Sequence, residues 1–202
     1  MTVVEEIVVK RLGQVAYTPT LDAMRRFTAE RDASTADELW LLEHPPVYTL
    51  GQGASPVQVG NHIPVIAADR GGEVTYHGPG QVVIYTLIDL GRRGIKVKAF
   101  VRLLEQAVID LIGSRATRRS GAPGVYVDGA KVAALGIRVT RARAYHGLAL
   151  NVDMDLTPFA AIDPCGYPGL AVTQTRDLGL AGTPSEMGER LAKRVIAHIE
   201  NA

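Results

Sequence analysis

The sequence predicts an α+β fold built on a mixed or antiparallel sheet that is flanked by helices. Segments with strand character outnumber segments with helix character, and the two kinds do not alternate strictly as they do in doubly wound folds. The dipeptide Asp128-Gly129 between two apolar runs is a strong signal for an antiparallel hairpin. The chain has 202 residues. We therefore expect one domain over 1–202, because two domains would each be small for a self-sufficient core.

Three stretches have the periodicity of amphipathic helices. Thr20–Arg31 carries apolar residues at spacings of three, and its expected cap is Thr18 or Thr20 itself. Lys98–Ser114 carries the clearest apolar stripe. The last helix follows Thr183, whose hydroxyl can cap it, and the glutamate three residues later completes a capping box.

The expected strands are short apolar runs bounded by Gly, Pro or Asp. They are Glu38–Leu42, Val47–Leu50, Pro64–Ala67, Gln81–Leu90, Gly124–Val127, Lys131–Thr140 and Tyr145–Val152. We expect the last three to be neighbours in the sheet, joined by the Asp128-Gly129 turn and by the 140–144 connection.

Composition excludes several classes of function. The net charge of +1 gives no whole-molecule field that would attract nucleic acid or an anionic membrane. The single cysteine rules out an internal disulfide and fits a reducing cytoplasm, where we expect the protein to act. Glu5 and Glu6 stand where a signal peptide would need an uninterrupted apolar region, and no uncharged run approaches the length of a membrane span.

Six arginines crowd the middle of the chain, and two interpretations of them stay open. They form a solvated face, or they receive an acidic partner. The six are Arg115, Arg118, Arg119, Arg138, Arg141 and Arg143. The five histidines have no metal-ligand spacing, and one cysteine removes the common structural zinc arrangements, so we expect no metal.

A glycine-rich segment, Arg70–Gln81, is the first candidate for chemistry. Its four glycines within eleven residues let the backbone approach a ligand closely, while Arg70, Tyr76 and His77 add directional donors. The alternative is a tight turn between the flanking strands. The segment matches neither a Walker A loop nor the dinucleotide fingerprint.

The lone cysteine is the second candidate. A lone cysteine is most often a small buried apolar residue, but Cys165 stands between Pro164 and Gly166, in a setting typical of an accessible, constrained loop. Lys131 opens an apolar run after the hairpin turn, and a cation near a thiol lowers the pKa of that thiol. A Cys–His pair that uses His77 or His146 is the rival to a Cys–Lys pair.

Six motifs in order make the chain resemble the lipoyl(octanoyl) transferases, or octanoyl-[acyl carrier protein]:protein N-octanoyltransferases. The motifs are Glu43–Gly51, Arg70–Gln81, Gly124–Val127, Lys131 with Leu135-Gly136, His146–Val152 and Pro164–Tyr167. The resemblance implies a fold similar to the catalytic domains of biotin and lipoate protein ligases. It also implies that Cys165 carries the acyl group as a thioester and that Lys131 is its catalytic partner.

The resemblance further implies the substrate-binding residues, with His146 in support. These are Arg70, Gly71, Gly72, Glu73, Val74, Thr75, Tyr76, His77, Ala134, Leu135, Gly136, Gly147, Leu148 and Ala149. We favour a role for His77 and His146 in shaping the pocket over a chemical role.

The implied reaction moves an octanoyl group from octanoyl-acyl carrier protein to a lysine of a lipoyl domain. The expected acceptors are the lipoyl domains of 2-oxoacid dehydrogenase complexes and the glycine cleavage H protein, and the enzyme is expected to be a monomer. No cofactor is expected, because the donor arrives activated. Two alternatives are an ATP-dependent lipoate or biotin protein ligase, and a non-catalytic module that binds carrier domains.

Overall fold

The computed structural model describes residues 6–55, 59–162 and 169–202 of the chain. Cys165, together with Pro164, Gly166 and Tyr167 beside it, lies outside the described residues. Within the described ranges, no helix is both long enough and apolar enough to cross a membrane.

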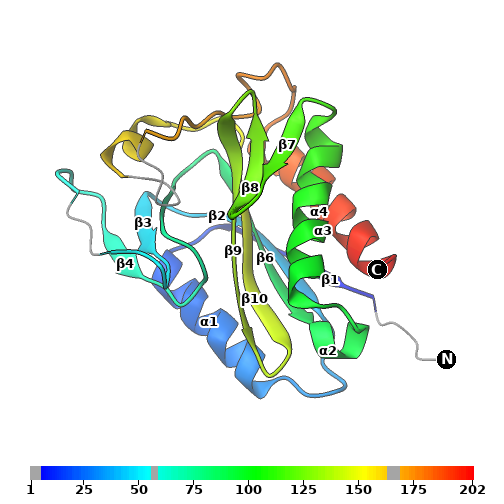
Figure 1. Ribbon diagram of the computed structural model, residues 1–202. Coiled ribbons are helices and arrows are strands. Elements are labelled where there is room, and N and C mark those ends of the chain that lie inside the picture. The colour runs from blue at the N-terminus through cyan, green and yellow to red at the C-terminus, as the bar shows by residue number, and fades with distance from the viewer. Residues whose placement is uncertain (1–5, 56–58, 163–168) are drawn as a thin grey trace.

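A mixed sheet of seven strands forms the centre of the described structure (Figure 1). In spatial order its strands are β1 (Val8–Gln14), β2 (Glu38–Glu43), β6 (Gln81–Asp89), β10 (Arg143–Asn151), β9 (Ala130–Thr140), β8 (Ala122–Val127) and β7 (Ala116–Arg119). β1 pairs with β2 in parallel and the other pairs are antiparallel. The predicted fold class is confirmed.

A second, three-stranded sheet lies beside the first. Its order is β4 (Val65–Ala67), β3 (Val47–Leu50) and β5 (Val74–His77), with β3 parallel to β4 and antiparallel to β5. The glycine-rich segment is therefore not a tight turn between its flanking strands. Those strands belong to different sheets, and the segment itself contains β5.

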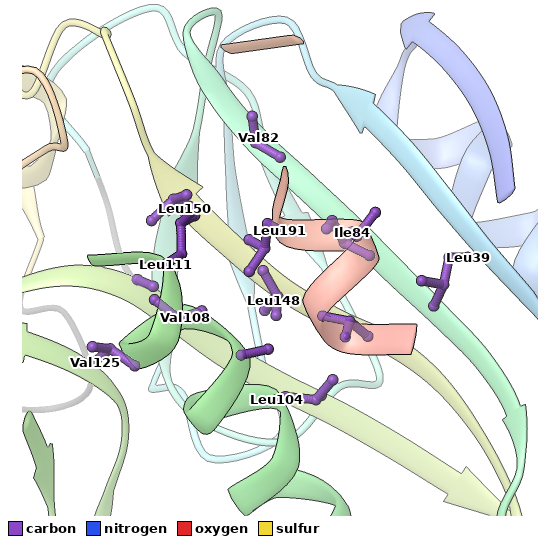
Figure 2. Packing of buried hydrophobic residues seen from close by; sticks show 14 of the residues in the cluster. Leu39, Val82, Ile84, Leu104, Val108, Leu111, Val125, Leu148, Leu150 and Leu191 are labelled. Atoms are coloured by element: carbon purple, nitrogen blue, oxygen red, sulfur yellow. The ribbon is translucent and has the colours of Figure 1, made fainter. Parts of the chain in front are cut away.

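Two long helices cover one face of the large sheet. Leu104, Val108 and Leu111 of α3 (Val97–Ile112) and Leu191 of α4 (Pro184–Glu200) point toward the even-numbered residues of β6 and β10 (Figure 2). Burial of each such side chain contributes roughly 1.5–3 kcal/mol relative to leaving it exposed. A short helix, α2 (Leu90–Arg93), joins β6 to α3, and a 3-10 turn (Thr157–Ala161) follows β10.

The opposite face of the sheet packs against α1 (Tyr17–Glu30). Here Leu21 and Met24 meet the odd-numbered residues of β6, such as Val83 and Tyr85. Since successive side chains of a strand point to opposite faces, β6 supplies both cores at once. A pocket can therefore form on the α1 face of the sheet wherever the strand side chains on that face are small.

The predicted helices and strands are present, with ends shifted by a few residues. Thr183 caps α4 in a complete capping box, as predicted. The predicted cap of α1 is wrong: the helix starts after Ala16, which has no side-chain cap, and the Thr20 hydroxyl donates to the Ala16 carbonyl from within the first turn.

Asp37 organises the end of the sheet near α2. Its buried carboxylate accepts hydrogen bonds from the guanidinium groups of Arg31 (2.6 Å), Arg92 (2.9 Å) and Arg93 (2.5 Å), and from the Asp89 N–H at 2.8 Å. Burial alone would raise the pKa of Asp37, but the Asp89 N–H and the guanidinium groups outweigh it and hold the pKa below its ordinary value.

We predict that Asp37→Asn lowers the free energy of unfolding by about 3–5 kcal/mol, because it leaves buried guanidinium charge without its counter-charge. Urea unfolding at pH 7 measures the loss. Asp128→Asn is the matched control, since the Asp128 side chain is 70% exposed and pairs with Arg115 at the surface. An Asp37→Asn loss no larger than that of the control would contradict the prediction.

Candidate functional site

A pocket opens on the α1 face of the large sheet and encloses about 500 Å³ when its open mouth is included. It is bounded by the 70–77 segment, by strands β6, β9 and β10, and by the first residue of α1. The lining residues are Tyr17, Arg70, Gly72, Glu73, Val74, Thr75, His77, Val83, Tyr85, Ala134, Leu135, Gly136, His146, Gly147, Leu148 and Ala149.

Most of the predicted substrate-binding residues thus line one pocket. Two of them do not: Gly71 lines a neighbouring hollow, and Tyr76 packs against Tyr48 and Phe159. Three lining residues lie outside the predicted set: Tyr17, Val83 and Tyr85. The inward alternation of β6 was the signal that could have found Val83 and Tyr85, but the start of α1 offered none for Tyr17.

The floor of the pocket consists of two cross-strand rows, in which the residues from β9 and β10 are small and those from β6 are larger. Ala134, Ala149 and Val83 are opposite one another on β9, β10 and β6, and Gly136, Gly147 and Tyr85 form the next row. The Gly71 N–H donates to the Ile137 carbonyl at 3.0 Å, which fastens the glycine-rich segment to β9 above this floor.

Arg70 is held in the wall of the pocket by β3. Its guanidinium donates to the Thr49 carbonyl at 2.7 Å and to the Thr49 hydroxyl at 2.9 Å, and it also donates to the Gly71 carbonyl at 3.0 Å. The side chain is buried. A fixed positive charge therefore borders the pocket, and it disfavours protonation of the neighbouring imidazoles.

His77 is a neutral imidazole with a defined tautomer. Gln81 donates through Nε2 to the Tyr76 carbonyl and to Asn151 Oδ1, so its Oε1 is the acceptor and His77 Nδ1 donates to it at 2.7 Å. Burial, with the nearby His44, lowers the pKa of His77 to about 3. His77 Nε2 is then left as an acceptor.

His44 is also neutral and lies behind the pocket. Its Nδ1 donates to the Val15 carbonyl at 2.6 Å, so its Nε2 accepts from the Tyr85 hydroxyl at 2.7 Å. Burial lowers the pKa of His44 to about 4, against a smaller opposing effect of the Val15 carbonyl. The Tyr85 hydroxyl is therefore already committed as a donor.

His146 occupies a strained position in the middle of β10. Its φ of +61° is unusual for a residue with a side chain, and the Thr86 hydroxyl donates to its carbonyl at 3.0 Å. Its Nε2 pairs with Asp69 at 2.8 Å, and Asp69 also accepts from Tyr145 and Arg25. Burial opposes ionisation of Asp69, but these donors prevail and hold its pKa well below the ordinary value.

Lys131 is buried beside the pocket, near the Ala134 row. Its Nζ donates to the Pro123 carbonyl at 3.3 Å and lies 5.2 Å from the centre of the Tyr126 ring. A Cβ built on Gly124, the residue opposite Ala134, would stand 3.3 Å from this Nζ. The ammonium group therefore lies next to the pocket floor, although Lys131 is not one of the residues that line the pocket.

The backbone of Lys131 is tied to the segment that follows Cys165 in sequence. Its N–H donates to the Ala171 carbonyl at 2.8 Å, and its carbonyl accepts from the Thr173 N–H at 2.9 Å. The Thr173 carbonyl accepts from Asn151, which accepts from Gln81 in turn. A continuous series of hydrogen bonds thus connects His77, through Gln81 and Asn151, to Thr173 beside Lys131.

A larger hollow, of about 1200 Å³ when its open mouth is included, adjoins the pocket. It is lined by Gly71–Glu73, Val101, Gly121–Pro123 and 135–137, so Gly72, Glu73, Leu135 and Gly136 border both spaces. The six central arginines do not form one patch. Three lie in or beside β7 at the edge of the sheet, and three lie in the β9–β10 hairpin.

We predict that the free energy of unfolding falls as the pH is lowered from about 6.5 toward 4. His44 and His77 have folded pKa values of about 4 and about 3, below the value near 6.5 of an unfolded chain. The unfolded state therefore takes up the protons first, so stability is full above pH 6.5 and is lost below it, by up to about 1.4 kcal/mol per pH unit for each group.

Urea unfolding at pH 7.5, 6 and 5 measures this slope. His77→Gln should reduce it, while His62→Gln, which removes an exposed imidazole, is the matched control. A stability that does not change between pH 7.5 and 5 would show that these imidazoles are not held neutral.

The chain is similar in sequence to known proteins over most of its length. Residues 16–195 match the family model of the Lipoyl protein ligase A/B catalytic domain. An octanoyltransferase from Thiobacillus denitrificans is 65% identical over 179 residues, which cover 86% of this chain and 82% of the relative. One from Dechloromonas aromatica is 57% identical over 198 residues, covering 96% of this chain and 97% of the relative.

Solved structures agree in fold at low identity. A lipoate-protein ligase A bound with ATP has a TM-score of 0.73 at 14% identity, covering 97% of this chain and 86% of that one. A biotin protein ligase from Aquifex aeolicus has a TM-score of 0.55 at 10% identity, covering 98% and 69%. The predicted similarity in fold to biotin and lipoate protein ligases is confirmed.

Proposed function

This chain belongs to the octanoyltransferase family with a Lipoyl protein ligase A/B catalytic domain, and from this premise we propose its reaction. It is an acyltransferase that moves an octanoyl group from octanoyl-acyl carrier protein to a lysine of a lipoyl domain. The acceptors are lipoyl domains of 2-oxoacid dehydrogenase complexes and the glycine cleavage H protein. The reaction takes place in the cytoplasm and needs no ATP, because the donor is already a thioester.

The observation that carries the proposal is the position of Lys131 relative to the pocket. The Lys131 ammonium lies beside Gly124, opposite Ala134, where the small-residue floor begins. An acyl chain on this floor would run from the Lys131 end toward the Gly136–Gly147 row. Each buried methylene contributes roughly 0.8 kcal/mol to binding. An acyl chain that fills a narrow pocket therefore binds more tightly than a shorter one.

In the first step the Cys165 thiolate attacks the carbonyl carbon of the donor thioester. The bond from that carbon to the carrier sulfur breaks, and the carrier leaves as a thiolate that takes a proton from the Lys131 ammonium, which leaves Lys131 as a neutral amine. The acyl-enzyme is again a thioester, so its energy is similar to that of the donor.

In the second step the amine of the acceptor lysine attacks the acyl-enzyme. An amide forms, the Cys165 thiolate leaves, and the nitrogen gives up a proton, for which Lys131 is the acceptor. The Gly71 N–H is already bonded to the Ile137 carbonyl, so the Gly72 N–H, and not that of Gly71, is the candidate oxyanion donor of the Gly71-Gly72 pair. Water must stay out during this step, or the thioester is hydrolysed.

We predict that mixing the protein with octanoyl-acyl carrier protein gives one octanoyl adduct by intact-mass analysis. Cys165→Ser should give no adduct that is labile to neutral hydroxylamine, because its hydroxyl is a far weaker nucleophile than a thiolate. Adding a lipoyl domain should discharge the wild-type adduct to the acceptor lysine. Absence of any adduct on the wild type under all conditions would overturn the proposal.

We predict that Lys131→Met slows transfer to the lipoyl domain by roughly 10²–10⁴, the usual contribution of a positioned proton acceptor. The same change should move alkylation of Cys165 by iodoacetamide to higher pH, because it removes a cation that favours the thiolate. Lys193→Met on the exposed face of α4 is the matched control. Transfer and alkylation profiles equal to those of the control would remove Lys131 from the mechanism.

A further inference from the structure

The side chain of Lys131 lies along β8 and ends at the peptide group between Pro123 and Gly124. Lys131 is opposite Tyr126 in the β8–β9 pair, and its Nζ stands 5.2 Å from the centre of the Tyr126 ring. The Nζ donates to the Pro123 carbonyl at 3.3 Å. A Cβ on Gly124 would stand 3.1 Å from Lys131 Cε, so the bare backbone at this position leaves room for the lysine chain.

Glu105 of α3 binds the same peptide group. Its Oε1 accepts from the Gly124 N–H at 3.1 Å, and only 7% of its side chain is exposed. That N–H and the Pro123 carbonyl belong to one trans peptide group, in which the two bonds point in opposite directions. The Lys131 ammonium and the Glu105 carboxylate are therefore joined through a single peptide.

Arg118 of β7 completes this row of groups at the surface. Its Nε pairs with Glu105 Oε2 at 3.1 Å, while 37% of its side chain remains exposed. Both oxygens of the buried carboxylate thus have a partner, as a buried charge requires. Hydrogen bonds in series polarise one another, so the carboxylate makes the Pro123 carbonyl a better acceptor for an ammonium group.

The orientation of the peptide depends on its acceptor. Gly124 has a φ of +140°, which glycine adopts at little cost, and the hydrogen bond from its N–H to Glu105 is buried. A buried N–H that loses its acceptor costs free energy. Without the carboxylate, the peptide would turn toward another acceptor and its carbonyl would no longer point at Lys131.

Resting on the proposed acyl transfer, we propose that Glu105 is a positioning residue that holds the Lys131 ammonium beside the pocket floor. Glu105 is not among the described residues that line the pocket or the adjoining hollow, so its effect on the reaction passes through the peptide and Lys131. Held in this way, Nζ can give a proton to the leaving carrier thiolate and take one from the attacking amine.

The rival explanation is that Glu105 only stabilises the packing of α3 on β8, and a double-mutant cycle separates the two. The experiment measures the rate of octanoyl transfer to a lipoyl domain, by intact mass, in the wild type, Glu105→Gln, Lys131→Met and the double variant. The glutamine keeps an oxygen that can accept from the Gly124 N–H and loses the negative charge. The Glu105→Gln variant is therefore expected to fold.

Glu105→Gln should slow transfer about tenfold when Lys131 is present and by less than about twofold in the Lys131→Met background. The concentration of lipoyl domain that gives half the maximal rate should not change. Arg118→Gln tests the same row from its exposed end, where no buried residue is replaced. It should slow transfer about threefold, again only when Lys131 is present.

Asp110→Asn is the matched control, because it removes a carboxylate from the same helix whose side chain is 41% exposed. Its transfer rate should equal that of the wild type. Equal losses in the two backgrounds, or a wild-type rate in Glu105→Gln, would overturn the positioning role while leaving acyl transfer intact. A wild type that octanoyl-acyl carrier protein does not acylate would overturn the proposed function and the positioning role with it.

Discussion

Gly136 and Gly147 face each other on β9 and β10, and neither position has room for a side chain. A Cβ on Gly147 would stand 2.1 Å from the Ile84 carbonyl oxygen, and one on Gly136 would stand 2.8 Å from the Gly71 carbonyl oxygen. These approaches bring β6 and the glycine-rich segment against bare backbone. The pocket depends on them, because any larger residue in this row would push its wall and its floor apart.

Several polar groups around this floor are also buried, so each of them needs a hydrogen-bond partner within the protein. Arg70 can enter the wall because Thr49 accepts three hydrogen bonds from its guanidinium group. A buried positive charge of this kind is tolerated only when it is hydrogen-bonded. His77 and His44 are then neutral and have single tautomers, each set by an acceptor at Nδ1. The wall of the pocket is thus preorganised by donors and acceptors that the backbone positions.

Much of this structure could be predicted from the sequence, and the omissions have physical causes. Apolar periodicity predicted α3, α4 and the strands of the hairpin series. It missed β1 and β7, which are edge strands with mostly exposed side chains, and β5, which lies within a glycine-rich segment. Family motifs predicted most of the pocket lining, but not Tyr17, which reaches the site only because α1 begins three residues before the predicted start.

The central claim is that the acyl chain lies on the small-residue floor with its carbonyl toward Lys131. The most direct measurement is a crystal structure of the protein after reaction with an octanoyl thioester. Octanoylated protein is expected to show density for the chain over Ala134, Gly136, Gly147 and Ala149. Density in the adjoining hollow, against Val101 and Pro123, would contradict the claim.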